Sequence, residues 1–286
     1  MLKANYHTHT VFCDGSDTAE AIVRYASRHG FTHLGFSGHM DPDIRMDYPA
    51  YLKEIRRLQE NRKKEEPDIL SGVELDILYD RYLKPDEGFP DAAFIRANAE
   101  YVIGSTHFLD VDTDEPVSVD SGPENIPLIC SRYFSGDYYK MCRAYFDLES
   151  RVFDTLRCTF VGHFDLITRF NDDLHFVDET DPRYLRPALE AMEYLAKEGV
   201  PFEINCGAVN RGRKKELYPH PLLLRALKDF GGEIVLSSDA HQKELLSGAF
   251  DQAAACAVSC GFTHTNILEH DKSGNVSWRQ VALDEI

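Results

Sequence analysis

The chain has 286 residues, of which 43% are hydrophobic and 28% are charged, and its formal net charge at pH 7 is −17. These values are typical of a globular protein, and we expect one domain that spans residues 1–286. The acidic charge disfavours a nucleic-acid partner, which would require Lys and Arg, and the lack of any apolar run near ~18 residues excludes a membrane span.

Seven cysteines are scattered along the chain, and none form a CxxC pair. Their odd number and irregular spacing argue against a disulfide framework and favour reduced thiols. The first residues contain no apolar segment followed by a small-residue cleavage site, so we expect no signal peptide. We therefore predict a cytoplasmic protein.

Short apolar runs alternate along the chain with helix-like stretches. The runs, each predicted to be a strand, are 2–7, 32–38, 68–75, 100–106, 158–163, 201–205 and 232–238. The helix-like stretches are 18–30, 49–65, 138–156, 183–199 and 219–232, followed by a closing helix within 245–261 and a short strand at 263–268. This alternation is typical of a parallel sheet covered by helices. About seven such units favour a barrel over an open sheet, so we predict a TIM-barrel-like α/β fold.

A histidine or a carboxylate lies at or just after the end of almost every predicted strand. These residues are His7, His9, Asp14, His39, Glu74, His107, His163, Asp239 and His241. In a parallel barrel the C-terminal ends of all strands lie on one face, which is where active sites form. We therefore expect these nine side chains to converge at one mouth of the barrel.

Imidazole and carboxylate groups together suit Zn, Fe or Mn. One zinc ion needs only three or four protein ligands, so nine candidates indicate two or three divalent ions. A single histidine at a strand end is more often a core or loop residue than a ligand, and the pair His7 and His9 is weak evidence by itself. The prediction depends on the repetition of ligand-type residues along the chain.

Taken as an ordered series, these motifs resemble the polymerase-and-histidinol-phosphatase (PHP) family of metal-dependent phosphoesterases. The series is YHTHT–FCDG, FSGH, GVE, GSTH, GHFD and SSDAH, and it spans residues 6–241. Two longer stretches resemble the histidinol-phosphatase branch of the family, namely GHFDLITRFN (162–171) and EINCGAVNRGRKKELYPHP (203–221).

The resemblance implies a distorted (β/α)7 barrel with a three-metal cluster at the C-terminal ends of the strands. Carried over residue by residue, the ligands of one ion would be His7, His9, Glu74 and Asp239. Glu74 would bridge to a second ion, whose other ligands would be His107 and His163. The ligands of the third ion would be Asp14, His39 and His241.

The resemblance also implies that Arg169 and Arg211, which follow two of the predicted strands, bind the phosphate of the substrate. Two places in the chain depart from the family pattern. Gly38 stands where an acidic residue often precedes the histidine of the second motif, and Arg213 and Lys214 differ from the pattern after Arg211.

Phosphate monoesters are very resistant to hydrolysis. Clustered ions would lower the pKa of water and offset the charge of the phosphoryl group. A hydroxide that bridges two ions would then attack in line, with Glu74, Asp239 and His241 serving catalysis and with no Ser or Cys nucleophile. The proton donor to the leaving alcohol is open between Asp165 and a metal-bound water, and a structural role for Asp165 beside a ligand is equally compatible with the sequence.

The activity that the resemblance implies is hydrolysis of L-histidinol phosphate to L-histidinol and phosphate, in histidine biosynthesis. Two alternatives stay open. One is a PHP-type phosphoesterase that acts on another small phosphate ester or a nucleotide, and the other is a metal-binding protein without turnover. The net charge and the lack of a basic or aromatic stretch argue against a polymeric nucleic-acid substrate, and the sequence indicates no particular oligomeric state.

Overall fold

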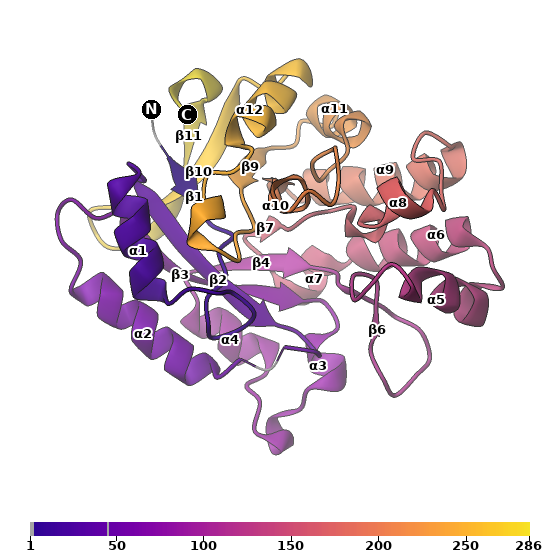
Figure 1. Ribbon diagram of the computed structural model, residues 1–286, viewed down its shortest axis with the longest axis horizontal. Helices are drawn as coiled ribbons and strands as arrows, with labels where there is room; N and C mark the ends of the chain where they lie inside the picture. Colours follow the sequence, from indigo (N-terminus) through magenta and orange to yellow (C-terminus); the bar gives the residue numbers. More distant parts are fainter. Residues whose placement is uncertain (1–2, 45) are drawn as a thin grey trace.

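The computed structural model describes residues 3–44 and 46–286. Its centre is a sheet of seven parallel strands in the order β1-β2-β3-β4-β7-β8-β9, which Figure 1 shows at the middle of the molecule. The strands are β1 Ala4–Asn5, β2 His33–Met40, β3 Asp68–Asp76, β4 Tyr101–Ser105, β7 Phe160–Val161, β8 Phe202–Asn205 and β9 Ile234–Ser237. All seven predicted strands are confirmed. They could be recognised in the sequence because a parallel strand that is buried on both faces is a continuous apolar run.

The two edges of the sheet meet just beyond the ends of β1 and β9. A parallel bridge joins Thr8 to Ala240. In this bridge His9 N donates to Ala240 O at 2.9 Å, and Ala240 N donates to His7 O at 3.1 Å. The sheet therefore closes into a barrel, as predicted. The barrel is distorted, because β1 and β7 contribute only two residues each.

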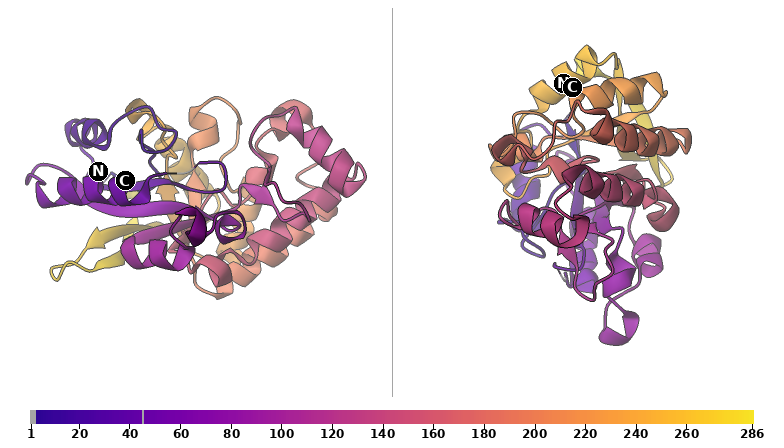
Figure 2. Two further views of the ribbon diagram at one scale, coloured as in Figure 1. Left: turned by 90° about the horizontal axis from the view of Figure 1, so that it is seen from below. Right: turned by 90° about the vertical axis from the view of Figure 1, so that its right-hand side faces the viewer.

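Helices surround the barrel on its outer side. They are α1 Ala19–Arg28, α2 Tyr48–Glu60, α3 Tyr79–Tyr82, α4 Ala92–Asn98, α5 Asn125–Phe134, α6 Tyr138–Glu149, α7 Val152–Leu156, α8 Asn171–Leu174, α9 Pro182–Lys197, α10 Gly207–Asn210, α11 Pro221–Asp229 and α12 Phe250–Ser259. Figure 2 shows α1 and α2 at one end of the molecule and the group formed by α5, α6 and α9 at the other. Within the described part of the chain, no helix combines the length and the apolar character needed to cross a bilayer.

The helix predicted over 138–156 is divided in two in the structure. α6 ends at Glu149 and α7 begins at Val152. Between them the Ser150 hydroxyl donates to Asp147 O at 3.0 Å, and a local bond of this type competes with the helical backbone ladder. The structure also contains elements that the sequence analysis did not predict, namely α3, α4, α5, α8, α10, the antiparallel pair β5 Phe108–Leu109 and β6 Val117–Ser118, and the last strand, β11 Val276–Ala282.

Aromatic rings fill the barrel towards the N-terminal ends of its strands. The Tyr101 ring lies against Gly35 and Gly72, where an added Cβ would come within 2.3 and 2.2 Å of it. The Tyr101 hydroxyl lies 2.6 Å from Tyr6 O and 2.9 Å from Phe36 O. Two glycines thus make room for one ring that ties β1 and β2 together from inside the barrel.

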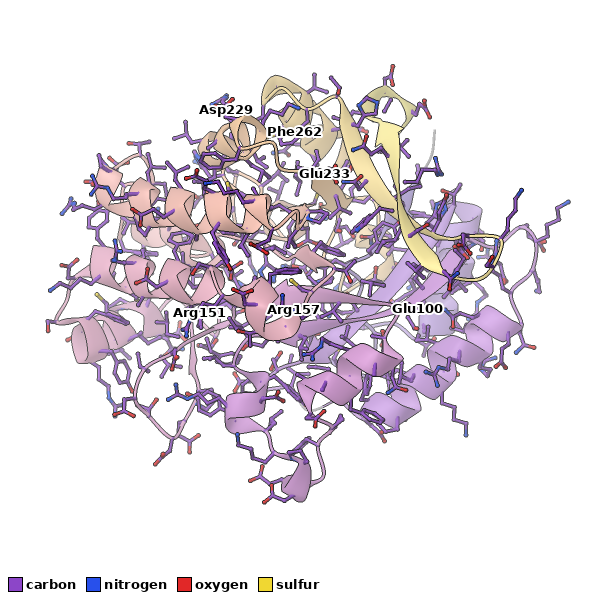
Figure 3. The ribbon with its side chains drawn as sticks, turned by 180° about the vertical axis from the view of Figure 1, so that it is seen from behind. Glu100, Arg151, Arg157, Asp229, Glu233 and Phe262 are labelled. Atoms are coloured by element: carbon purple, nitrogen blue, oxygen red, sulfur yellow. The ribbon has the colours of Figure 1, made fainter. Side chains whose placement is uncertain are left out.

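A hairpin at the C-terminal end of the chain covers this end of the barrel. It consists of β10 His264–His270 and β11 Val276–Ala282. The Tyr6 hydroxyl donates to Leu268 O at 2.8 Å and accepts from Leu268 N at 2.9 Å, and His270 Nε2 lies 2.8 Å from Glu100 Oε1. Figure 3 shows the hairpin from behind, with Glu100 labelled near its tip. The hairpin therefore closes the end of the barrel opposite to the strand C-termini, and it leaves the other mouth accessible.

Candidate active site

The structure brings together all nine residues that were predicted to converge. They come from the ends of six strands and from the loops that follow them, at the mouth of the barrel opposite to the hairpin. Seven of the nine are buried, whereas His241 is half-buried and Asp14 is exposed. Their roles as metal ligands stay predictions.

Glu74, at the end of β3, lies at the centre of the group. Its Oε2 is 3.0 Å from His7 Nε2 and 3.1 Å from His39 Nδ1. Its Oε1 is 2.8 Å from His163 Nε2 and 3.2 Å from His107 Nε2. Burial by itself raises the pKa of Glu74, but the neighbouring imidazoles outweigh burial and hold this pKa well below its usual range. Glu74 is therefore an anion surrounded by imidazole nitrogens.

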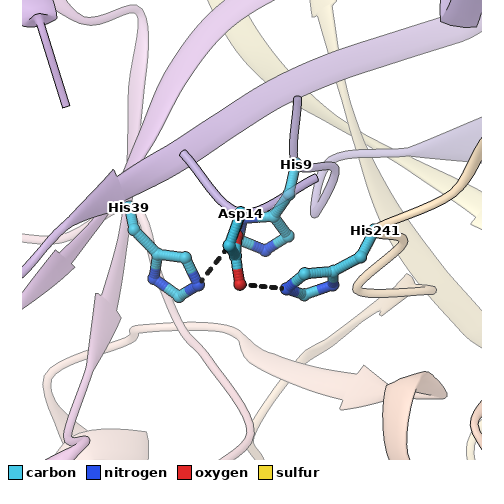
Figure 4. A group of neighbouring side chains, drawn as sticks. All are labelled: His9, Asp14, His39 and His241. Carbon is cyan, nitrogen blue, oxygen red and sulfur yellow. Dashed lines mark ion pairs between the residues drawn. The ribbon is translucent and has the colours of Figure 1, made fainter. Parts of the chain in front are cut away.

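A second group forms around Asp14, in the loop after β1 (Figure 4). Asp14 Oδ2 is 3.0 Å from His241 Nε2, and Asp14 Oδ1 is 3.7 Å from His9 Nδ1 and 3.8 Å from His39 Nε2. Burial, together with the charges of His241 and His39, lowers the pKa of His9 to about 3. His9 is therefore neutral at pH 7, which is the form of imidazole that binds a metal ion.

Asp239 connects the cluster to an arginine. Its Oδ1 is 3.2 Å from His9 Nε2, and its Oδ2 accepts from Arg211 Nη2 at 3.0 Å. Burial by itself raises the pKa of Asp239. The charges of Arg211 and His7 outweigh burial and hold this pKa well below its usual range. The backbone of Asp239 has a φ of 48°, a left-handed conformation that costs energy for a residue other than glycine. The strained backbone thus directs an ionised carboxylate towards the histidines.

The buried donor atoms of the cluster fit divalent cations. His7 Nε2, His9 Nε2, His39 Nδ1 and Glu74 Oε2 are buried and make no hydrogen bond in the described part of the chain, and buried polar atoms of this kind need a partner. Sets of atoms within 4.8 Å of one another are offered by His9, Asp14, His39 and His241; by His7, His9 and Asp239; by His7, Glu74 and His163; and by His39, Asp41 and His107. Nitrogen and oxygen donors in such sets suit Zn, Mn or Fe.

Three carboxylates that the sequence analysis missed contact the imidazoles of predicted ligands. Glu203 and Asp76 face the ring nitrogen that is turned away from Glu74, whereas Asp41 faces the same nitrogen of His39 as Glu74 does. Glu203 Oε1 lies 2.7 Å from His7 Nδ1. Asp41 Oδ2 lies 3.2 Å from His39 Nδ1, and Asp76 Oδ2 lies 3.2 Å from His107 Nδ1. Carboxylates in this position orient a metal-binding imidazole. For two of them a signal was present, since Asp41 and Asp76 each follow a predicted ligand by two residues, which places both side chains on one face of a strand.

A cavity of about 350 Å³ opens beside the cluster. Its lining includes Asp14, His39, Glu74, His107, His163, Asp239 and His241, and also Asp41, Asp43, Asp120, Arg169, Arg211 and Arg213. Arg169 Nη1 donates to Asp120 Oδ2 at 2.9 Å. Both predicted phosphate-binding arginines therefore face the same cavity as the predicted metal ligands.

Asp165, the predicted candidate for the proton donor, is not among the described residues that line this cavity. It is fully buried, and its Oδ2 accepts from His220 N at 3.0 Å. Burial raises the pKa of Asp165 to about 6. In this position the carboxyl group holds the segment around His220 in place, and its role as a proton donor stays a prediction.

Glu149, in α6, is a buried acidic side chain that is not one of the nine proposed ligands. Its side chain is fully buried, and burial raises its pKa from 4.5 to about 8. Between these two values the folded chain holds a proton that the unfolded chain has released, so stability falls as the pH rises from about 4.5 through about 8. We expect Glu149→Gln to leave the free energy of unfolding nearly unchanged at low pH and to increase it by about 1 kcal/mol or more at high pH.

The measurement is urea-induced unfolding of both proteins on either side of this pH range. Glu198→Gln, at an exposed position, is the matched control and should change the stability little at either pH. An effect of Glu149→Gln that is equal at both pH values would contradict the expectation.

Comparison with known proteins identifies the family of this chain. A family model described as PHP domain matches residues 5–207. A protein of Deinococcus radiodurans named "Probable histidinol-phosphatase" is 30% identical over 251 residues, which cover 82% of this chain and 85% of that protein. A protein of Schizosaccharomyces pombe with the same name is 25% identical over 294 residues, which cover 96% of this chain and 92% of that protein.

Structural comparison agrees with the sequence comparison. A solved structure of histidinol phosphate phosphatase from Lactococcus lactis, complexed with Zn, L-histidinol and phosphate, matches with a TM-score of 0.69 and 23% identity. The match covers 93% of this chain and 97% of that chain, and it confirms the predicted distorted (β/α)7 barrel. The chain belongs to the PHP family, within its histidinol-phosphatase branch.

Proposed function

We propose that this protein is a metal-dependent phosphomonoesterase that hydrolyses L-histidinol phosphate to L-histidinol and phosphate, a step of histidine biosynthesis. The observation that carries the proposal is one cavity that holds both a histidine and carboxylate cluster and the arginines Arg169 and Arg211. The relatives named as histidinol-phosphatases, and the relative solved with L-histidinol and phosphate, support the choice of substrate.

Two or three divalent ions, Zn, Mn or Fe, are proposed as cofactors, held by the nine predicted ligands. The solved relative contains Zn, which supports this class of ion. When bound, such ions supply positive charge that stabilises the phosphoryl group and lowers the pKa of water. Glu74, Asp239 and His241 would serve catalysis by holding this charge at the cavity.

The chain's own residues would bind and orient the ester. Arg169 and Arg211 would donate hydrogen bonds to phosphoryl oxygens, because a guanidinium group matches the geometry of phosphate. Asp120 would keep Arg169 directed into the cavity, through the 2.9 Å bond between Arg169 Nη1 and Asp120 Oδ2. Asp239 would do the same for Arg211. Both cations would thus be oriented before the substrate arrives, which reduces the cost of binding.

The test is phosphate release by the purified protein from L-histidinol phosphate, beside an aryl phosphate, with chelation and with restoration of each metal. We expect chelator-sensitive turnover with kcat/KM about a hundredfold or more higher for L-histidinol phosphate. Weak or equal turnover of the two esters would overturn the assigned substrate and favour another small phosphate ester. Turnover that survives complete removal of metal would overturn the proposed cofactors.

We also propose that the protein acts in the cytoplasm. All seven cysteines are free thiols, and five of them are buried, which supports a reducing compartment.

A further inference from the structure

Arg213 is the third arginine of the cavity, and it differs from the other two in having no hydrogen-bond or ion-pair partner for its side chain among the described residues. Arg169 is paired with Asp120, and Arg211 is paired with Asp239. The Arg213 side chain makes no hydrogen bond or ion pair with any residue in 3–44 or 46–286, although it lines the same cavity. Its positive charge is therefore available to a ligand.

The chain around Arg213 is held in place, so its position at the cavity is built into the fold. Arg213 N donates to Ala208 O at 2.9 Å. The next residue, Lys214, is only 5% exposed, and its Nζ donates to Thr168 Oγ1 at 2.7 Å. Thr168 directly precedes Arg169 in the chain. Lys214 thus fixes the segment of Arg213 against the segment of Arg169.

Three guanidinium groups at one cavity repel each other unless an anion lies among them. The Arg213 side chain is exposed where it lines the cavity, and loss of solvation, together with the charges of Arg169 and Arg211, lowers its pKa. Asp120 offsets part of this charge, but it is already bonded to Arg169. A phosphate dianion would relieve the repulsion and would give Arg213 its partner.

We propose that Arg213 is a further substrate-binding residue, which donates to the phosphate group from the side of the cavity formed by the 211–217 segment. The inference rests on the proposed function, in that the substrate is a phosphate ester. Arg213 raises the affinity of the protein both for the phosphate group of the substrate and for the inorganic phosphate that is released. The part of the substrate without phosphate does not contact Arg213.

The experiment compares Arg213→Met with Lys215→Met, both in the metal-loaded protein. Lys215 is exposed and does not line the cavity, so the second variant removes the same charge from the same segment without altering the cavity. Binding of inorganic phosphate is measured by titration calorimetry. KM and kcat for L-histidinol phosphate, and inhibition by L-histidinol, are measured alongside.

In Arg213→Met, we expect the dissociation constant of inorganic phosphate and KM to rise about tenfold or more, as for loss of a hydrogen bond to a charged group. The value of kcat should stay within about twofold, and the inhibition constant of L-histidinol should not change. Arg213→Lys should restore part of the affinity, and Lys215→Met should behave as the unmodified protein.

Unchanged phosphate binding in Arg213→Met would overturn the proposal, as would an equal loss in Lys215→Met. The calorimetric measurement does not depend on turnover. If the unmodified protein binds inorganic phosphate but does not hydrolyse L-histidinol phosphate, the proposed substrate fails while the role of Arg213 is still decided by the variant. If the unmodified metal-loaded protein does not bind phosphate, the proposal for Arg213 fails as well.

Discussion

Replacing Glu74 with glutamine is expected to lower kcat/KM for L-histidinol phosphate about a thousandfold or more. The Glu74 carboxylate lies within 3.2 Å of His7, His39, His107 and His163, so it contacts residues of all three proposed metal sites at once. An amide has nearly the same shape but carries no charge, and its nitrogen cannot bind a cation. We therefore expect the metal content per chain to fall together with activity, by at least one ion, as measured by mass spectrometry of the purified variant.

Glu100→Gln is the matched control for Glu74→Gln. Glu100 is also a partly enclosed glutamate that lies beside a histidine, His270, but at the opposite end of the barrel. Its replacement should leave both the metal content and kcat/KM within about twofold, since the partners of Glu100 are Gln59, Ser71 and His270, which are not proposed ligands. Thermal unfolding of both variants separates loss of activity from loss of the fold. Full activity and full metal content in Glu74→Gln would contradict the proposed central role.

Replacing Tyr101 with alanine is expected to lower the free energy of unfolding by about 3–5 kcal/mol. The Tyr101 ring is 2% exposed and fills the space left by Gly35 and Gly72, and removing it leaves a cavity in the barrel and two carbonyl groups without their donor. Tyr101→Phe keeps the ring and removes only the hydroxyl bonds to Tyr6 O and Phe36 O. This variant should lose about 1 kcal/mol.

The measurement is urea-induced unfolding followed by the fluorescence of Trp278, which lies in β11 and packs on Phe160. Tyr194→Ala is the control, because the Tyr194 side chain is 39% exposed and should lose less than about 1 kcal/mol. Equal losses in Tyr101→Ala and Tyr194→Ala would contradict the structural role of the ring. If Tyr101→Ala does not fold, Tyr101→Phe still gives a graded result.

The strands and the proposed ligands could be predicted from the sequence for one physical reason. A parallel strand such as β3 is buried on both faces, so it appears as an apolar run, and a buried Glu74 at its end is conspicuous against that run. His7 and His9 stand out in the same way after β1. Local patterns of this kind need no knowledge of which strands are neighbours.

The features that the sequence did not reveal depend on contacts between residues that are far apart in the chain. Glu203 lies inside the apolar run 201–205. Its contact with the His7 imidazole cannot be predicted from the sequence, because the two residues are 196 positions apart in the chain. β11 is mostly exposed or partly buried, and in the described part of the chain it pairs with β10 alone, so it lacks the continuous apolar signal of the barrel strands. The free charge of Arg213 likewise follows from the pairing of Arg169 and Arg211 with aspartates, which no spacing along the chain indicates.

The bridge between Thr8 and Ala240 has a consequence for how the metal centre forms. Proposed ligands flank this bridge on both sides, with His7 and His9 on the first strand segment and Asp239 on the last. Before the two segments meet, neither offers the set that an ion requires. Because a ligand that binds only the closed form favours that form by mass action, ions held here would also stabilise the contact between the first and last strands of the barrel. Metal supply during synthesis would then affect how much of the protein matures as well as how fast the mature protein works.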